Sequence, residues 1–551
     1  MSFVRKRPGE LLAFASGLVF AASTPPTDIQ PGILIGLVGF ALALALLDPA
    51  REPKPLRAGA RRGFFFGLAA NLLALRFVPE VMARFTDLPK ALGWVALVLL
   101  SAAQALPWAV GAAVAAWLAR PSMKPRHLRR VDPPKVPSFV AFGIGVFAAT
   151  FVPAVFPWTP AGGLARWPVL LQTAELVGER GTSFLVAVAC GLVADAIMRG
   201  TQAQGRRLRA SVPPLAIGAA MFGVLLAYGW IRMHAIDAQR AASPHAKVAL
   251  LQPDFDATFR WEQDRAQLML DRLSTLTRRA EEAGAVLTVW PESAYPYTLA
   301  HGVKSSPPGM RAVLQHGVRG PVLTGAYLKK GGGLGTNSTI LVEPNGHIGP
   351  SYDKRHLLWF GETVPLADTF PILRKVFARG TGLEPGTQSV AFRAGPIVAT
   401  VRHCFEDTLP QAGREAMEPR PNLLVNVTND AWFVGSAEGE LHLRLAVLRS
   451  IEARRDLVRA VNRGPTTWVD ANGRVVARHD ATPGLGPSPP LIADAALLEA
   501  PVTLYTRFGD VPLVLLIVIA LALPGAHGVL RRRLRPQASG LGPREDEERE
   551  S

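Results

Sequence analysis

Eight apolar stretches, each long enough to cross a lipid bilayer, constrain the fold of this 551-residue chain more than any other feature. Seven crowd the first 232 residues and one lies near the C-terminus, with centres near Ala15, Val38, Leu72, Ala105, Val146, Val188, Phe222 and Ile517. Because lipid offers no hydrogen-bond partners, such segments must fold as helices. We therefore predict a multi-pass α-helical membrane domain, with seven spans in residues 1–235 and an eighth in residues 508–530. The fourth stretch holds Pro107 and is predicted to be one kinked helix.

Basic residues alternate with these stretches. They cluster before the first stretch and after the second, fourth, sixth and eighth, at Arg5 to Arg7, Arg51 to Arg62, Arg120 to Lys135, Arg199 to Arg209, and Arg531 to Arg535. The intervening short loops carry few or no basic residues. Since basic loops stay in the cytoplasm, both termini are predicted to be cytoplasmic and the long segment between spans seven and eight to lie outside.

The charge pattern also bears on partners. A net charge of +17 is common in nucleic-acid-binding proteins, but here the charge gathers at membrane edges, where it suits lipid head groups. No helix-turn-helix, zinc or aromatic-basic pattern accompanies it, so we predict no nucleic-acid partner.

Of the two cysteines, Cys190 lies inside an apolar stretch and is interpreted as packing, without a disulfide to Cys404. Residues 535–551 are polar and are predicted to be a disordered tail.

Residues 246–495 have the alternating pattern of a soluble α/β domain of ordinary size. Predicted helices cover Phe259 to Ala283 and Glu440 to Arg454, and predicted strands cover Lys247 to Gln252, Val286 to Trp290, Pro321 to Tyr327, Thr336 to Val342, Ile397 to Val401, Leu423 to Val427, Leu457 to Val461 and Thr467 to Asp470. The glycine-rich segment Lys330 to Thr336 looks like a phosphate loop but lacks its lysine, so we interpret it as a hairpin connection or a mobile loop.

Reactive side chains follow three of these strands. Cys404 comes just after one strand, Glu292 directly after a second, and Asn429-Asp430 after a third. Because open α/β sheets gather their chemistry beyond the carboxyl ends of strands, these ends are predicted to converge. A carboxylate that accepts the thiol proton and a cation such as Lys354 would together make Cys404 a nucleophile for acyl transfer. Taken singly, Glu292 and Lys354 also fit solvated charges in loops.

Together, the order and context of these residues resemble the carbon-nitrogen hydrolase (nitrilase) superfamily. The resemblance rests on Trp290-Pro291-Glu292, Tyr352-Asp353-Lys354, Phe360-Gly361-Glu362, Cys404-Phe405-Glu406 and Asn429 to Phe433. With membrane spans on both sides of the domain, the chain is similar to the apolipoprotein N-acyltransferase branch. That resemblance implies a nitrilase-type αββα sandwich on the periplasmic side of a bacterial inner membrane. It also implies a fatty acyl chain taken from a phospholipid, expected to be phosphatidylethanolamine, and passed to the amine of diacylglyceryl apolipoproteins.

The resemblance also assigns roles to residues of this sequence. Glu292 would be the general base, Lys354 the oxyanion stabiliser and Cys404 the nucleophile. Two carboxylates would support them, namely Glu362 beside Lys354 and Glu406 near the cysteine. Substrate binding would involve Trp261, which equally fits simple packing of its helix, and Trp432. No cofactor is implied, and His356, His403 and His442 show no metal-ligand spacing.

Two alternatives stay open. The same triad fits a membrane-tethered amidase or nitrilase-type hydrolase, in which water is the second nucleophile, and a catalytically dead scaffold that binds lipoproteins. Seven spans exceed what a tether needs, and the intact triad argues against a dead scaffold.

The chain departs from the family pattern in three places. Phe405 stands where some members have tyrosine, and Val434-Gly435-Ser436 differs from the usual glycine-aspartate pattern. Arg402-His403 replace the apolar residues usual just before the nucleophile. Strand alternation predicts that the His403 ring faces away from the side of Cys404.

Overall fold

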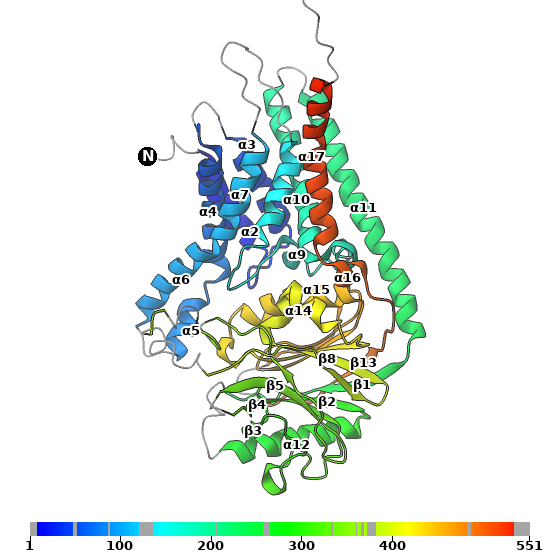
Figure 1. Cartoon of the computed structure of the whole chain (residues 1–551). Coiled ribbons are helices and arrows are strands. Elements are labelled where there is room, and N and C mark those ends of the chain that lie inside the picture. The colour runs from blue at the N-terminus through cyan, green and yellow to red at the C-terminus, as the bar shows by residue number, and fades with distance from the viewer. Residues whose placement is uncertain are drawn as a thin grey trace, which may run out of the picture.

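The computed structural model describes residues 8–47, 52–85, 89–120, 136–203, 207–256, 265–331, 334–359, 361–364, 369–371, 382–481 and 486–533. A bundle of helices forms one end of the molecule and a two-sheet sandwich forms the other (Figure 1). The principal bundle helices are α2 (Pro8–Ala21), α3 (Gly32–Ala45), α4 (Pro55–Ala74), α7 (Leu106–Leu118), α8 (Ser138–Ala149), α10 (Ala174–Gln202), α11 (Arg207–Ala242) and α17 (Val511–Arg533).

The predicted apolar centres all lie in these helices or at a helix junction. Ala105 separates α6 (Lys90–Gln104) from α7, and Pro107 stands in the first turn of α7, as the predicted kink requires. Within the described residues, three helices are long and apolar enough to cross a membrane: Lys90–Leu118, Ala174–Gln202 and Arg209–Ala242. A fourth candidate is formed by α4 together with the helix Val78–Arg84, which is bent by 49° relative to α4. Four further apolar helices are shorter: Pro8–Ala21, Gly32–Ala45, Ser138–Ala149 and Val511–Ala522.

Small residues let the bundle helices approach closely. Gly111 on α7 and Gly145 on α8 face each other so tightly that a Cβ on either would collide with the carbonyl oxygen of the other. Membrane helices associate through such contacts because lipid provides no hydrophobic force between them. The bundle interior also holds an aromatic cluster, in which the Phe40 and Phe66 rings stack 4.1 Å apart and Trp108 packs edge-on.

The polar domain contains two sheets. The first follows the order β13-β1-β2-β4-β5-β6, with β3 beside β4, and the second follows β12-β11-β10-β9-β8-β7. The strands are β1 (His245–Leu250), β2 (Leu287–Val289), β3 (Leu299–Ala300), β4 (Val322–Lys329), β5 (Gly335–Val342), β6 (Tyr352–Asp353), β7 (Ala391–Ala394), β8 (Ile397–His403), β9 (Leu423–Asn429), β10 (Leu457–Asn462), β11 (Thr466–Val469), β12 (Val475–His479) and β13 (Leu491–Ala496). Strands β1, β2 and β4 are parallel neighbours, as are β8, β9 and β10.

The two sheets pack face to face and helices cover their outer faces. Val248 and Leu323 of the first sheet share one buried core with Val401 and Val425 of the second. Helix α12 (Ala266–Glu282) covers the first sheet, whereas α14 (Pro410–Ala416) and α15 (Glu438–Ala453) cover the second. The predicted αββα sandwich is thereby confirmed. The predicted hairpin connection is confirmed too, since β4 and β5 pair as antiparallel neighbours around it.

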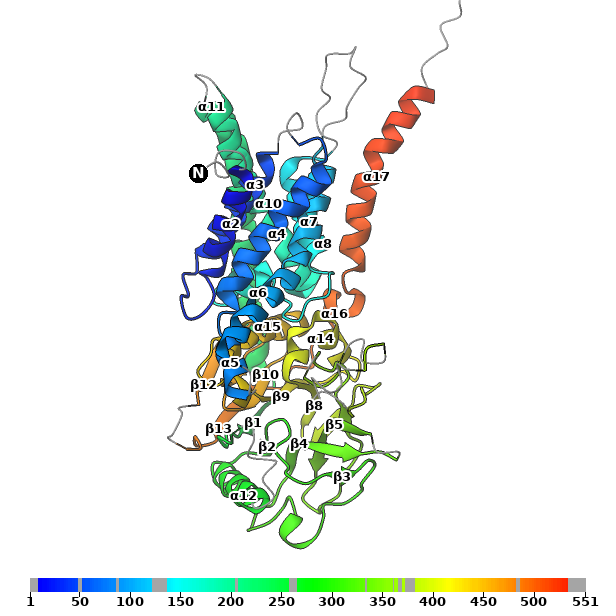
Figure 2. The same ribbon diagram turned by 90° about the vertical axis from the view of Figure 1, so that its left-hand side faces the viewer.

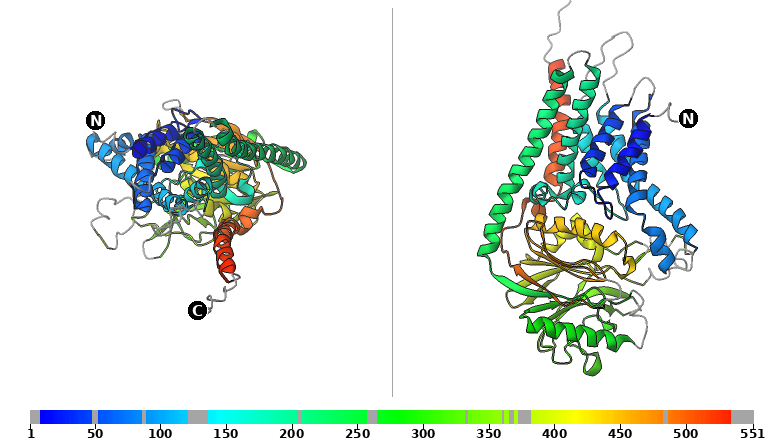
Figure 3. Two further views of the ribbon diagram at one scale, coloured as in Figure 1. Left: turned by 90° about the horizontal axis from the view of Figure 1, so that it is seen from above. Right: turned by 180° about the vertical axis from the view of Figure 1, so that it is seen from behind.

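Helix α15 is also the contact surface for the bundle. Its Arg449 pairs with Glu179 of α10 and, at 3.0 Å, with Glu452. Helix α10 is interrupted at Gly178, where φ is +69°, so the amide of Glu179 is free to donate to Glu452 at 2.8 Å. Helix α11 runs from the far end of the bundle to the edge of the sandwich, where β1 begins (Figure 3). Helix α17 stands on the outside of the bundle (Figure 2).

Candidate active site

The nucleophile candidate, Cys404, stands at a sharp bend between a strand and a helix. Strand β8 ends at His403, and Cys404 opens the 3₁₀ helix η6 (Cys404–Thr408) with φ at +48°. This left-handed conformation costs a non-glycine residue on the order of 1–3 kcal/mol and persists only where surrounding contacts enforce it. Here Asn426 and His442 both donate to the carbonyl oxygen of Cys404, at 3.1 and 3.2 Å. The thiol is therefore held out of the sheet.

A buried lysine with two carboxylates lies beside this bend. Lys354 Nζ is 3.2 Å from Glu292 Oε1 and 2.8 Å from Glu362 Oε2. The side-chain amide of Asn337, on β5, donates to both carboxylates at 2.8 and 2.9 Å. The Lys354 side chain is only 2% exposed, so its interactions are little weakened by solvent. These ion pairs fix Lys354 in a single place.

Electrostatics set distinct protonation states for the three groups. Burial raises the pKa of the Cys404 thiol well above its ordinary value, and the Glu292 carboxylate raises it further against the opposing effect of Lys354. Burial also opposes ionisation of Glu292, but the charge of Lys354 lowers its pKa to about 2. The pKa of Lys354 is raised by Glu292 and Glu362 despite burial. The site at neutral pH therefore holds a thiol, a carboxylate and an ammonium group.

Glu406 connects the sharp bend at Cys404 (the cysteine bend) to residues 352–359 around Lys354 (the lysine segment). Fully buried, its carboxylate accepts hydrogen bonds from the Tyr352 hydroxyl and from the backbone amides of Arg355, His356 and His403, all at 2.8–3.0 Å. This single side chain thus connects residues on both sides of the reactive group.

The ring of His403 contacts Glu292 rather than Cys404. Its Nδ1 is 3.6 Å from Glu292 Oε1 and its Nε2 is 2.7 Å from Thr339 Oγ1. His403 is the last residue of β8 and follows the alternation of the strand, with its ring on the side of Val401 and the first sheet. The left-handed φ of Cys404 turns the chain only after His403.

Of the two tryptophans expected to bind substrate, the structure describes only Trp432. Trp261 lies outside the described residues. Trp432 lies in the 3₁₀ helix η7 (Ala431–Phe433), directly after Asp430, and is half-buried. Asn337 was not among the residues predicted for the site, although a polar residue inside the predicted strand Thr336 to Val342 is a signal that could have identified it.

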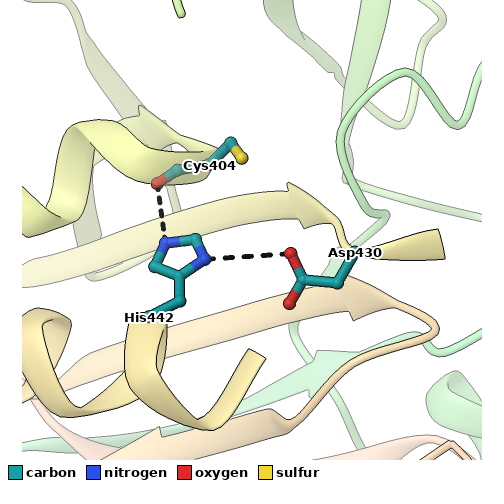
Figure 4. Close-up of side chains that lie close together, drawn as sticks. All are labelled: Cys404, Asp430 and His442. Atoms are coloured by element: carbon teal, nitrogen blue, oxygen red, sulfur yellow. Dashed lines mark hydrogen bonds and ion pairs between the residues drawn. The ribbon is translucent and has the colours of Figure 1, made fainter. Parts of the chain in front are cut away.

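A second group of polar side chains lies on the other side of Cys404. The Cys404 sulfur, an Asp430 carboxylate oxygen and a His442 ring nitrogen are all within 4.8 Å of one another (Figure 4). His442 Nε2 is 2.8 Å from Asp407 Oδ1, and Asp407 Oδ2 accepts from Arg459 Nε at 3.0 Å. Although burial opposes a charge on the ring, Asp407 raises the pKa of His442 to about 10. Three strand ends thus converge as predicted, bringing Glu292, Cys404 and Asp430 together.

A cavity of about 620 Å³ separates this region from the helical bundle. Phe405, the residue after the nucleophile, lines it together with Leu358 and Trp359 from the lysine segment. The bundle contributes mostly apolar side chains to the opposite wall, including Trp108, Phe151, Phe156 and Trp158. An apolar ligand in this cavity would therefore touch both halves of the molecule.

The helical bundle and the sandwich each match a known protein family. Residues 16–192 match the apolipoprotein N-acyltransferase N-terminal domain, and residues 247–485 match the carbon-nitrogen hydrolase family. An apolipoprotein N-acyltransferase of Geobacter metallireducens is 31% identical over 512 residues, which cover 91% of this chain and 92% of that protein. One from Caulobacter vibrioides is 31% identical over 556 residues and 96% of both chains. A solved amidase of Nesterenkonia sp. is 18% identical, has a TM-score of 0.36, and covers 49% of this chain and 95% of its own.

The sandwich and the helices that flank it define a carbon-nitrogen hydrolase-type enzyme joined to a membrane domain with several apolar helices. The identity to curated relatives extends through both parts, from the first bundle helices into the sandwich. The chain belongs to the apolipoprotein N-acyltransferase family.

Proposed function

We propose that this chain transfers a fatty acyl chain from a phospholipid, through a thioester on Cys404, to the N-terminal amine of a diacylglyceryl-cysteine lipoprotein. The observation that carries the proposal is a cavity shared with the helical bundle, lined by Arg355 and Phe405, the residues that follow Lys354 and Cys404, and by mostly apolar side chains of the bundle. A soluble substrate needs no such wall of apolar helices. A phospholipid acyl chain would reach the thiol through this cavity while its head group stays near the membrane surface.

In the first half-reaction, Glu292 accepts the thiol proton as the sulfur attacks the ester carbonyl of the phospholipid. Lys354 stabilises the oxyanion of the tetrahedral intermediate, because its ammonium group is already fixed where negative charge develops. Collapse breaks the ester C–O bond, and Glu292 returns the proton to the departing lysophospholipid alkoxide. The raised pKa of Cys404 makes this base necessary, since the free thiol is hardly ionised.

In the second half-reaction, the neutral α-amine of the lipoprotein attacks the thioester carbonyl. Glu292 takes a proton from the attacking nitrogen and delivers it to the Cys404 sulfur as the C–S bond breaks. The products are an amide on the lipoprotein and the original thiol. Lys354 again stabilises the oxyanion, so the same three residues serve both steps.

The other predicted residues take supporting roles in this proposal. Glu362 would keep Lys354 charged and in place through its 2.8 Å ion pair. Glu406 would hold the cysteine bend against the lysine segment. Trp432 and Trp261 would contact the substrate, and phosphatidylethanolamine would be the donor.

We propose that the sandwich is periplasmic and that both termini are cytoplasmic. This orientation is supported by the basic clusters of α4, α10 and α17, because these residues stand at the bundle end remote from the sandwich (Figure 1). A cysteine-accessibility map should label positions within 245–495 from the periplasm and positions in the Arg120 to Lys135 cluster only from the cytoplasm. A cytoplasmic sandwich would refute both the orientation and the lipoprotein role.

The transfer itself is tested with purified full-length protein, phosphatidylethanolamine and a diacylglyceryl-cysteine peptide. We expect the free-amine peptide to gain one acyl chain as an amide, and the N-acetylated peptide to gain none. Mass spectrometry of the peptide and quantification of free fatty acid distinguish the outcomes. Steady release of fatty acid without acylated peptide would instead identify a hydrolase.

A further inference from the structure

The cluster formed by Cys404, Asp430 and His442 has the composition of a metal site, although its residues come from three different elements. Cys404 opens η6, Asp430 follows β9 and His442 lies on α15. Zn²⁺ binds thiolate, imidazole and carboxylate at about 2.0–2.3 Å, which places tetrahedral ligands about 3.3–3.8 Å apart. The distance from His442 Nδ1 to Asp430 Oδ1 is already 3.8 Å. The sulfur lies within 4.8 Å of a ring nitrogen of His442 and of a carboxylate oxygen of Asp430, so a shift of about one ångström would complete the set.

The histidine is oriented as in a metal site. His442 Nε2 faces Asp407 at 2.8 Å, and Asp407 is itself held by Arg459. Metal-binding histidines nearly always donate their second ring N–H to such a carboxylate, which fixes the other nitrogen toward the metal. In this arrangement the nitrogen left for a metal is Nδ1, which faces Asp430.

Asp430 provides an independent observation. Its side chain is buried, with the residue 2% exposed, yet neither carboxylate oxygen has a hydrogen-bond partner within the described part of the chain. Glu438 Oε2 is also without a hydrogen bond there. Buried carboxylates that lack donors are costly, and nature usually satisfies them with a partner or a bound cation. The charged ring of His442 approaches Asp430 at 3.8 Å, beyond a hydrogen bond, and the neighbouring Glu438 carboxyl adds a second acidic group.

We propose that Cys404, Asp430 and His442 form an inhibitory site for Zn²⁺ or another divalent cation that prefers sulfur and nitrogen ligands. The cation displaces the thiol proton of Cys404 and the Nδ1 proton of His442, and both protons pass to solvent. No oxidation state changes. The sulfur lone pair bound to the metal can no longer attack a carbonyl, so the nucleophile is reversibly blocked. The site rests on geometry alone, while inhibition of acyl transfer rests additionally on the proposed function.

Alkylation of Cys404 tests the site without any lipid substrate. Full-length protein in detergent is treated with iodoacetamide, with and without buffered Zn²⁺; the second cysteine, Cys190, is buried in the bundle at 1% exposure. We expect Zn²⁺ to slow alkylation at least tenfold and EDTA to restore the original rate. Co²⁺ bound to the unmutated protein should show a thiolate charge-transfer band that is absent from Cys404→Ser. Failure of protection in the unmutated protein would overturn the proposal.

Variants separate this site from binding by the thiol alone. Asp430→Asn and His442→Gln should each weaken Zn²⁺ protection at least tenfold, and Asp407→Asn about 10–100-fold through loss of the outer carboxylate. The control is His316→Gln, which removes an exposed histidine paired with Asp271 at 3.0 Å and should leave protection unchanged. Unchanged protection in Asp430→Asn and His442→Gln would refute the three-residue site. If these variants do not fold, the Co²⁺ spectrum of the unmutated protein decides, whatever the outcome of the acyl-transfer assay.

Discussion

Replacing Lys354 with methionine removes the charge that, in our account, stabilises the oxyanion. Its Nζ is fixed 3.2 Å from Glu292 and 2.8 Å from Glu362, so no other group can replace it without rearrangement. Loss of one such donor typically costs about 2.7–4 kcal/mol, or about 10²–10³-fold in rate. Because Lys354 also lowers the pKa of the Cys404 thiol, its loss further disfavours the thiolate. We expect thioester formation to slow by at least about 100-fold.

The same substitution should destabilise the fold, and the two effects can be separated. Removing one partner of a buried ion pair costs about 3–5 kcal/mol, because Glu292 and Glu362 are left without their counter-charge. The double variant Lys354→Met/Glu362→Gln removes one of these carboxylates and should regain part of the lost stability. It should regain none of the activity. Thermal unfolding in detergent and the rate of acyl-enzyme formation, followed by intact mass, measure the two quantities independently.

Lys330 provides a matched control. Its Nζ lies 3.2 Å from Glu384, the same distance as in the buried pair, but the two side chains are 33% and 40% exposed. Exposed pairs contribute about 0–1 kcal/mol, so Lys330→Met should change neither stability nor rate appreciably. Turnover within about threefold of the unmutated enzyme in Lys354→Met would refute the reasoning. Recovery of turnover in the double variant would refute it equally.

Three further predictions concern Glu292, His442 and Gly178. Glu292→Gln keeps the side-chain shape but cannot accept the thiol proton, so intact mass should show thioester formation slowed about 10²–10⁴-fold; an unchanged rate would exclude Glu292 as the base. The pKa of His442 is raised to about 10, above the ordinary histidine value of about 6.5. The protonated His442 ring should therefore contribute fully to the free energy of unfolding below pH 6.5, and this contribution should disappear as the pH rises through about 10. Chemical denaturation between pH 6 and 10 should show this loss in the unmutated protein and not in His442→Gln. Gly178 has a φ of +69° and lies against the Tyr505 ring, so Gly178→Ala should lower the unfolding temperature. Gly223 has open space around it, so Gly223→Ala should leave the unfolding temperature unchanged. Equal effects of the two substitutions would exclude a special role for the break in α10.

Much of the fold followed from hydrophobic pattern alone. The predicted strand Thr336 to Val342 corresponds to β5 (Gly335–Val342), and Leu423 to Val427 corresponds to β9 (Leu423–Asn429), because buried runs of this length have few alternatives. Strands β3, β6, β7, β12 and β13 were missed. The exposed Val475 and Val476 of β12 illustrate the reason, since a strand at the edge of a sheet lacks a continuous buried run.

The site was predictable where residues follow strands directly and unpredictable where contacts are long-range. Glu292 and Cys404 were found because each ends an apolar run. The left-handed bend at Cys404 was not predictable, because such a bend has no local sequence signal in a residue other than glycine. The Arg449–Glu179 contact joins residues 270 positions apart, and no periodicity relates them. The metal-ligand set escaped the sequence for the same reason, since Asp430 and His442 have no characteristic spacing from Cys404.

The thioester on Cys404 is the central claim, and one measurement tests it most directly. Intact mass of the purified protein is recorded after exposure to phospholipid without acceptor, for the unmutated chain and for Cys404→Ala. Our account predicts a long-lived adduct equal to one fatty acid minus water, cleaved by neutral hydroxylamine, absent from Cys404→Ala, and discharged by a diacylglyceryl-cysteine peptide with a free amine but not by its acetylated form. Absence of the adduct in the unmutated protein, or its persistence in Cys404→Ala, would contradict the account.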